Sequence, residues 1–164
     1  MELVVAHSLF DFNINELMVH KSQPNRTYTV CWVFPKLNKI ALSLQRTKPT
    51  KPILVDVGGD IDGDAWEEYQ RKPNDFIGSA LYESETPEKR ADALAKYDKI
   101  RPIIESGDIE LYIKGDLGSA NLRSYVNEQK ITIQTLYKYL NQYLAFGSHP
   151  LALLPMTFIC GTLR

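Results

Sequence analysis

Cysteine is scarce in this sequence, and long apolar segments are absent. Only two of the 164 residues are cysteines, Cys31 and Cys160, and they lie far apart and in no metal-ligand cluster. We therefore expect two reduced thiols, as in cytosolic proteins. No run of 18 apolar residues occurs, and residues 1–8 lack the layout of a signal peptide. The sequence thus predicts neither a membrane span nor secretion.

Recognisable catalytic motifs are also missing. No Gly-rich phosphate loop, Ser-His-Asp set or Cys-His pair can be assembled from the residue spacing. The histidines His7, His20 and His149 are isolated from ligand or catalytic partners and are expected to be ordinary core or surface residues. We therefore expect no catalytic residue, bound metal or cofactor in this chain.

The net charge of −1 hides an uneven distribution of charge. Residues 1–55 carry a net charge of +4, residues 56–88 carry −8 and residues 89–164 carry +3. Two mildly basic segments therefore flank an acidic one, and the near-neutral total does not exclude binding to nucleic acid.

The first third of the chain favours β-structure. Short β-prone runs occupy residues 2–7, 14–20, 27–34 and 39–44, and residues 53–57 are a candidate last strand. Turn residues separate these runs, so a small antiparallel meander or partly closed barrel is expected over residues 1–57. Tyr28, Val30, Trp32 and Phe34 alternate along one run, and its aromatic residues are expected to form a core rather than a binding platform.

Residues 58–86 are predicted to be an acidic connector, with one short helical turn at 65–71. Its carboxylates have the D-x-D-x-D spacing of a calcium loop. However, Ala65 occupies the loop position that needs glycine, and Arg71 the position of the closing glutamate. A solvated linker is therefore expected rather than a metal site. The acidic side chains concerned are Asp56, Asp60, Asp62, Asp64, Glu67 and Glu68.

Residues 87–147 show helical periodicity. Thr86 and Pro87 are typical of a helix start, and the apolar pattern continues to residue 106, with Pro102 expected to kink or split the helix. Residues 109–116 are predicted to be a linker, and further helices are expected at 117–128 and 132–145. Gly147 would end the last helix, and residues 148–164 would be extended.

The last two helices have the spacing of a helix-turn-helix motif. Val126 and Ile131 would fill the apolar positions of the first helix and the turn. Leu136, with Tyr139 or Leu140, would line the inner face of the second helix. Lys130 occupies a turn position where glycine is frequent, at a local cost in strain. A helical hairpin in a small bundle is the alternative interpretation. The predicted fold is α+β: a small antiparallel β-rich N-terminal module followed by an all-α helix-turn-helix domain.

The second helix of the motif would carry the DNA contacts. Thr132 is expected to cap it, and Gln134 and Lys138 can pair with base edges in the major groove. Ile133 can contact a thymine methyl group, and Thr135 and Tyr137 can donate to phosphates. Lysines around the β-unit either follow the DNA backbone or serve solubility. The predicted DNA-binding set is Lys130, Thr132, Ile133, Gln134, Thr135, Tyr137, Lys138, Asn141 and Gln142.

Two sequence patterns resemble a known family. The first, Y-x-K-I-x-P-I-I, is found at residues 97–104 and includes Pro102. The second is T-x-x-T-x-Y-x-x-L-x-x-Y-W-x-x-G-x-x-x-x-A-L-x-P, followed by a glycine. This chain matches it without a gap, and its one difference at the named positions is Leu144 in place of the tryptophan. Both resemble the N-terminal DNA-binding region of TnsB, the DDE transposase subunit of Tn7-like cut-and-paste transposons. The matching residues of the second pattern are Thr132, Thr135, Tyr137, Leu140, Tyr143, Gly147, Ala152, Leu153, Pro155 and Gly161.

This resemblance implies sequence-specific binding of double-stranded DNA at transposon ends. In the family an RNase H-like catalytic core with Mg²⁺ follows, so the chain is expected to be a non-catalytic N-terminal fragment or a truncated gene product. Residues 148–164 would then lead towards that core. A cytoplasmic, nucleoid-associated location and partners such as a TnsA-like endonuclease and a TnsC-like ATPase are also implied. A stand-alone helix-turn-helix regulator and a protein-docking module remain as alternatives.

The chain departs from the family at the end of the second motif helix. Asn141 and Gln142 occupy positions where the family usually has an arginine pair that would contact phosphates. Their loss would remove two charge-assisted contacts and weaken the salt-dependent affinity. The chain would then either bind its DNA sites more weakly or use other basic residues, such as Lys130, Arg123 and Lys114.

Overall fold

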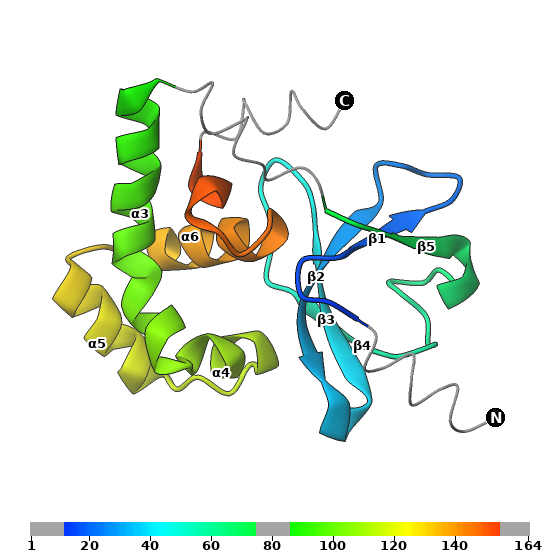
Figure 1. Ribbon diagram of the computed structural model, residues 1–164. Coiled ribbons are helices and arrows are strands. Elements are labelled where there is room, and N and C mark those ends of the chain that lie inside the picture. The colour runs from blue at the N-terminus through cyan, green and yellow to red at the C-terminus, as the bar shows by residue number, and fades with distance from the viewer. Residues whose placement is uncertain (1–11, 75–85, 155–164) are drawn as a thin grey trace.

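The computed structural model describes residues 12–74 and 86–154, and the backbone alone of Leu151. An antiparallel sheet occupies the first range and helices occupy the second, as Figure 1 shows. The α+β class expected from the sequence is therefore confirmed. We call residues 12–74 the sheet module and residues 86–154 the helical module. In the described ranges no helix is both long and apolar enough to cross a membrane.

The sheet has five strands in the order β4-β3-β2-β1-β5, and all neighbouring strands are antiparallel. The first four strands form the expected meander, and β5 joins the free edge of β1. The predicted strand at residues 2–7 lies outside the described residues. The strands are β1 (Leu17–His20), β2 (Thr27–Phe34), β3 (Lys39–Leu44), β4 (Ile53–Asp56) and β5 (Tyr69–Lys72).

A β-bulge in β2 changes the face to which its side chains point. The register with β3 shifts between Val30 and Trp32. Before the shift, Tyr28 and Val30 lie in the core of the sheet module; after it, Phe34 joins the core of the helical module, and Trp32 packs against that core. A bulge adds one residue to one strand, so the expected regular alternation breaks at this point. One strand thereby supplies apolar side chains to both modules, and its aromatic residues are structural, as expected.

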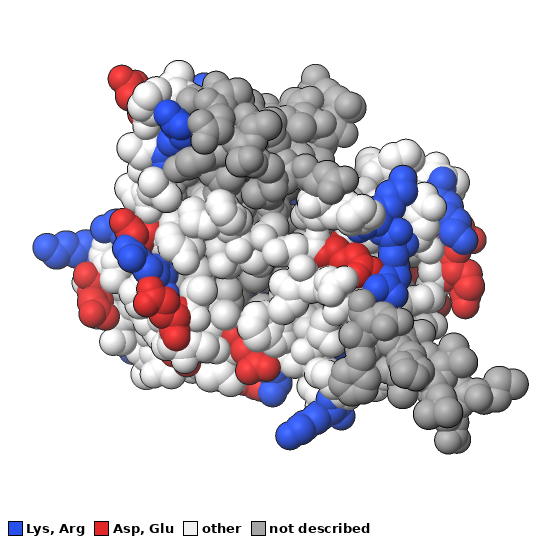
Figure 2. Space-filling view, viewed as in Figure 1, with Lys and Arg blue, Asp and Glu red and all other residues white. Residues whose placement is uncertain are grey.

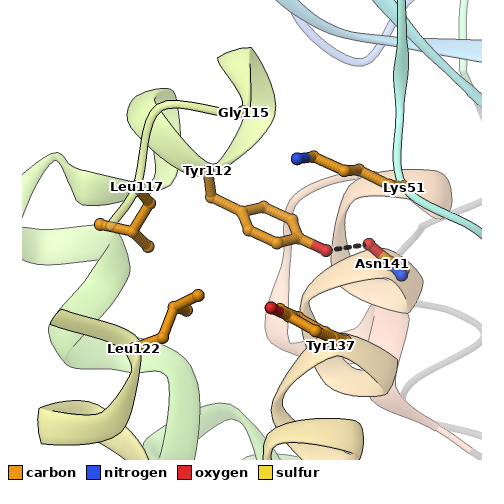
Figure 3. Close-up of a pocket in the computed structure, with 7 residues that line it drawn as sticks. All are labelled: Lys51, Tyr112, Gly115, Leu117, Leu122, Tyr137 and Asn141. Atoms are coloured by element: carbon orange, nitrogen blue, oxygen red, sulfur yellow. Dashed lines mark hydrogen bonds between the residues drawn. The ribbon is translucent and has the colours of Figure 1, made fainter. Parts of the chain in front are cut away.

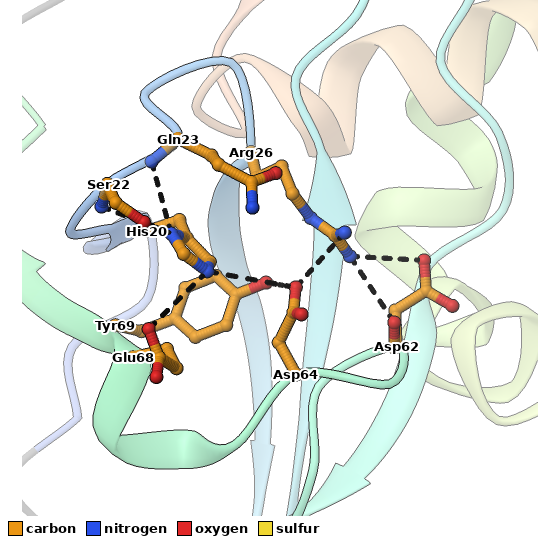
Figure 4. Close-up of polar contacts among 8 residues, drawn as sticks. All are labelled: His20, Ser22, Gln23, Arg26, Asp62, Asp64, Glu68 and Tyr69. Carbon is orange, nitrogen blue, oxygen red and sulfur yellow. Dashed lines mark hydrogen bonds and ion pairs between the residues drawn. The ribbon is translucent and has the colours of Figure 1, made fainter.

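Much of the acidic segment after β4 belongs to the sheet module. Ile61 is fully buried in the sheet core, and β5 pairs with β1 along its whole length. Arg26 forms ion pairs with Asp62 and Asp64, at 3.6 and 3.0 Å (Figure 4). The prediction of a connector is therefore wrong as far as Lys72, while most of the carboxylates are exposed to solvent as expected. The difference arises from a tertiary contact, because an arginine from the β1–β2 turn neutralises part of the acidic charge of this segment.

His20 ties the same segment to the β1–β2 turn. Its Nδ1 accepts hydrogen bonds from the backbone N–H groups of Ser22 and Gln23, at 3.2 and 3.1 Å. The ring proton therefore lies on Nε2, 3.9 Å from carboxylate oxygens of Asp64 and Glu68 (Figure 4). Glu68 ends the 3₁₀ turn η2 (Trp66–Glu68), which matches the expected helical turn. Within residues 12–74 and 86–154, no three His, Cys, Asp or Glu side chains form a group able to hold a metal.

The helical module contains α3 (Pro87–Ser106), α4 (Asp108–Lys114), α5 (Ser119–Gln129) and α6 (Ile133–Ala145). Helix α3 begins where the sequence predicts, because the Thr86 hydroxyl accepts from the Lys89 N–H at 3.2 Å. It ends at Gly107, whose φ of 86° is accessible to glycine at little cost. Pro102 lies inside this helix without splitting it.

Two segments predicted to be irregular are helical instead. The expected linker at 109–116 is largely α4, which buries Ile109, Tyr112 and Ile113. Residues expected to be extended after Gly147 include the 3₁₀ helix η3 (Pro150–Leu153). Both elements are too short for periodicity to reveal, and both are stabilised by burial against other helices. Residues 155–164 of the predicted tail lie outside the described residues.

The sheet and helical modules share a core. Cys31, Phe34 and Ala41 of the sheet lie in the same buried cluster as residues from α3, α4, α5 and α6. The Thr29 hydroxyl donates to the carbonyl of Ala145, and Trp32 Nε1 donates to Glu110 Oε1 at 3.1 Å. Helix α6 lies between α3 and the sheet in Figure 1. The C-terminal end of α6 is therefore fixed against the sheet.

Candidate nucleic-acid interface

Helices α5 and α6 are joined by the tight turn that the predicted helix-turn-helix motif requires. Lys130 ends α5 in the left-handed conformation, with φ 58° and ψ 45°, at the position where glycine is frequent. The Ile131 N–H donates to the Val126 carbonyl at 3.1 Å, and Lys99 Nζ donates to the Gln129 carbonyl at 2.9 Å. The carbonyl groups at the end of α5 are thus bonded, and the chain reverses within three residues. This confirms the predicted helix boundaries.

Thr132 caps the N-terminus of α6, as predicted. Its hydroxyl oxygen accepts from the Thr135 N–H at 3.1 Å and its proton is donated to the Thr135 hydroxyl at 2.9 Å. Since Thr135 accepts in this pair, its own hydroxyl proton is free to be donated outward. The N-terminus of α6 therefore presents both oriented amide groups and a hydroxyl donor.

The inner face of the motif also agrees with the sequence. Leu136 and Leu140 are fully buried in the core of the helical module. Val126 and Ile131 pack partly buried against the same core. These contacts fix α6 relative to α5 and leave one stripe of α6 facing away from the bundle.

The outward stripe of α6 is exposed only in its N-terminal half. Gln134 and Lys138, four residues apart, are exposed on one face, and Lys130 is exposed at the turn. Ile133 and Tyr137 are half-buried and pack against the helical core, so only part of each side chain is accessible. The accessible polar groups of this face thus belong to only a few of the predicted DNA-binding residues.

Asn141 and Gln142 are not on the accessible face, and their predicted DNA contacts are wrong. Asn141 is 9% exposed and its Oδ1 accepts from the Tyr112 hydroxyl at 2.6 Å. Gln142 is 5% exposed and its Nε2 donates to the carbonyls of Ala152 and Leu154 at 2.8 and 2.9 Å. Both amides are held within the protein, because α4 and η3 cover this end of α6.

A pocket of about 340 Å³ lies beside the exposed half of α6. The rings of Tyr112 and Tyr137 stack there at 5.8 Å, and Lys51 Nζ lies 5.1 Å from the centre of the Tyr112 ring (Figure 3). Burial raises the pKa of the Tyr112 hydroxyl, which therefore stays protonated as a donor to Asn141. Asn141 also lines the pocket, and the remaining lining comes from Gly115, Leu117 and Leu122.

Sequence reasoning missed Tyr112 as a neighbour of the motif helix. It falls in a segment predicted to be a linker, and Lys51 lies 61 positions before it in a β-rich region, so no local pattern connects them. Only the docking of the sheet on α6 brings the two side chains together. The nearest available signal was the basic, proline-containing run at residues 46–52.

Charge is mixed over the surface of the described residues. On the face drawn in Figure 2, positive and negative side chains alternate around a broad uncharged area. Several cations are paired with carboxylates, among them Lys39 with Asp56 at 2.8 Å. Electrostatic binding of DNA thus depends on local groups of unpaired cations rather than on a continuous basic face.

Comparison with known families gives one match to this part of the molecule. Residues 94–156 match the family model described as the TnsB second domain. The helical module is therefore similar to a TnsB second domain. The match begins within α3 and includes α4, α5, α6 and η3, so it takes in the predicted helix-turn-helix segment and the elements that cover Asn141 and Gln142.

The match supports a transposase-related role, and it confirms the resemblance to TnsB carried by residues 97–104 and 132–155. The sheet module lies outside the matched residues. No curated protein matches the chain. The similarity to TnsB is thus carried by the helical module.

Proposed function

We propose that this chain binds transposon-end DNA sequence-specifically through its TnsB second domain, with α6 in the major groove. The observation that carries the proposal is the exposed pair Gln134 and Lys138 on the N-terminal half of α6, following a capped helix-turn-helix turn. A glutamine can pair with adenine and a lysine with guanine acceptors at the base edges. A recognition helix inserted by its N-terminal turns presents these positions to the bases.

Contacts to the phosphate backbone would orient the helix. The amide groups at the N-terminus of α6, the Thr135 hydroxyl and the exposed Lys130 are positioned to contact phosphates on one side of the groove. Ile133 and Tyr137 would contribute through their exposed parts. Asn141 and Gln142 have no place in this interface. TnsA-like and TnsC-like partners, and Mg²⁺ in a catalytic core, belong to the same proposal for the parent protein.

The first test is selection of binding sites from a random duplex library by the purified chain, followed by sequencing. We expect one sequence motif to be enriched, because Gln134 and Lys138 discriminate between bases. Enrichment of no motif, or equal binding of selected and scrambled duplexes, would remove the proposal and favour a protein-docking role.

The second test uses variants of the two exposed residues. Gln134→Ala and Lys138→Ala are each expected to weaken binding to the selected duplex by about 1–3 kcal/mol and to relax preference at particular base pairs. Fluorescence anisotropy titrations measure the affinity, and repeated selection measures the preference. Gln70→Ala and Lys36→Ala, at exposed positions of the sheet module, are the matched controls. An unchanged preference in both α6 variants would refute docking through this face.

A further inference from the structure

The loop between β3 and β4, residues 45–52, carries a concentrated positive charge. Arg46, Lys48 and Lys51 are all exposed, and the loop contains no acidic residue. Among the residues that the structure describes, none of the three cations forms an ion pair with a carboxylate. Pro49 and Pro52 restrict the backbone and lower the entropy lost when the loop is ordered by a partner. Its charge is therefore available to an external anion.

Both ends of this loop are anchored beside α6. At its start, Gln45 Nε2 donates to the Ala145 carbonyl at 3.3 Å and to the Thr29 hydroxyl at 3.1 Å. At its end, Lys51 lies over the Tyr112 ring, which stacks on Tyr137 of α6 (Figure 3). The loop thus keeps a fixed position relative to the motif helix although it comes from a different module.

One stripe of α6 connects the loop to the proposed DNA-binding face. Gln134, Lys138, Asn141 and Ala145 follow at spacings of four, three and four residues and so share one face of the helix. The first two are exposed, while the last two are covered by Tyr112 and by the sheet. A duplex contacted by the first two must therefore pass close to the elements that cover the last two. The 45–52 loop is one of those elements.

The electrostatics of α6 alone are weak. Its sequence, Ile133–Ala145, holds a single cation, Lys138, whereas the loop holds three. Affinity for duplex DNA depends on the number of phosphates that cations neutralise. A groove-binding helix of this kind therefore needs cations from another element to hold the backbone beside the groove.

We propose that the 45–52 loop is a backbone clamp, in which Arg46, Lys48 and Lys51 contact phosphates flanking the major groove that α6 enters. This inference rests on the proposed function and assigns part of the DNA site to the sheet module. The clamp contributes affinity but no base preference, because phosphate contacts are independent of sequence.

Other lysines of the sheet module do not share this position. Lys39 pairs with Asp56, and Lys36 lies in the β2–β3 turn, at the opposite end of β3 from the loop. Lys72 is in β5, at the opposite edge of the sheet from β4. Lys36 and Lys72 are exposed and provide a matched control with the same change of charge.

The test measures affinity against salt concentration for the whole chain. Lys48→Gln/Lys51→Gln and the control Lys36→Gln/Lys72→Gln are titrated with the selected duplex and with a scrambled duplex. We expect the clamp variant to bind both duplexes more weakly by a similar factor. Its plot of log affinity against log salt should be shallower by roughly 0.9 for each phosphate that is no longer neutralised, or about 1.8 for two phosphates. The control variant should keep the wild-type slope. Lys48→Gln alone, at an exposed loop position, should reduce the slope by about half as much.

The possible outcomes separate the clamp from the proposed function. If wild type prefers the selected duplex and the clamp variant keeps the wild-type slope, the clamp is refuted and the proposed function remains. Loss of base preference without a change in slope would also refute the clamp, since it would assign Lys51 to the base-reading face. If wild type shows no preference, the proposed function fails and the clamp fails with it. Circular dichroism of each variant verifies folding, and Lys48→Gln decides the matter if the double variant unfolds.

Discussion

Asn141 and Gln142 illustrate what burial does to a polar residue on a motif helix. Gln142 Nε2 bonds two carbonyls, those of Ala152 and Leu154, which follow α6 in the chain. A buried amide with satisfied partners contributes modestly to stability, but its removal leaves the partners unpaired at a larger cost. Gln142, which the sequence placed among the DNA-binding residues, therefore holds η3 against α6.

At the residue scale we predict that Gln142→Ala lowers the free energy of unfolding by about 1–3 kcal/mol, because two buried carbonyls lose their donor. Urea unfolding followed by circular dichroism measures the change. Gln134→Ala, on the same helix but exposed, is the control and should change stability by less than about 0.5 kcal/mol. Equal effects of the two substitutions would contradict the burial of Gln142.

Caps and turns are the residue-scale features that sequence predicted well. Thr86, Thr132 and Lys130 all occupy the positions expected, because a cap or turn depends on neighbours within four residues. The environments of Asn141 and Tyr112 were not predictable in this way. Their hydrogen bond joins residues 29 positions apart on two helices.

At the element scale, α4 depends on left-handed residues at both ends. Gly107 and Gly115 flank its seven residues with φ of 86° and 84°, and these glycines allow α3, α4 and α5 to change direction sharply. Lys130 makes the corresponding reversal after α5 at φ 58°, where a residue with a Cβ is strained. At the turn between α5 and α6, lysine is therefore a less stable residue than glycine would be.

We predict that introducing glycine at the end of α5 and removing it at the end of α4 have opposite effects on the free energy of unfolding. Lys130→Gly should raise the free energy of unfolding by about 0.5–1 kcal/mol, because relief of the left-handed strain exceeds the entropy cost of glycine. Gly115→Ala should lower it by about 1 kcal/mol, since alanine is strained at a positive φ. Thermal unfolding compares both variants with wild type. A loss of stability in Lys130→Gly would show that the turn carries no strain.

At the scale of the whole molecule, the sheet and the helices form one body rather than two. The buried cluster around α6 includes Cys31, Phe34 and Ala41 of the sheet, and the β2 bulge is what directs Phe34 into it. Burial raises the pKa of the Cys31 thiol to about 12, so this cysteine stays a neutral core residue. Helix α6 is consequently packed against sheet residues that lie outside the segment matched to the TnsB second domain.

We predict a single cooperative unfolding transition for both modules. In a Trp66→Phe variant the remaining tryptophan, Trp32, lies at the junction and bonds Glu110. Its fluorescence and the far-ultraviolet circular dichroism of the helices should give coincident denaturation curves. Thr29→Val should shift both curves together to lower denaturant, because the Ala145 carbonyl loses a buried donor. Separate midpoints would indicate modules that fold independently.

The sequence by itself determined the α+β order of elements, the start and end of α3, the turn between α5 and α6 and the resemblance of the helical part to TnsB. These features arise from periodicity, capping and motif spacing, which act between near neighbours in the chain. Only the tertiary structure decided that the segment after β4 adds strand β5 beside β1, that α4 covers Asn141 and that Lys51 lies beside α6. Burial and ion pairing between distant segments set these features, and neither leaves a local pattern in the sequence.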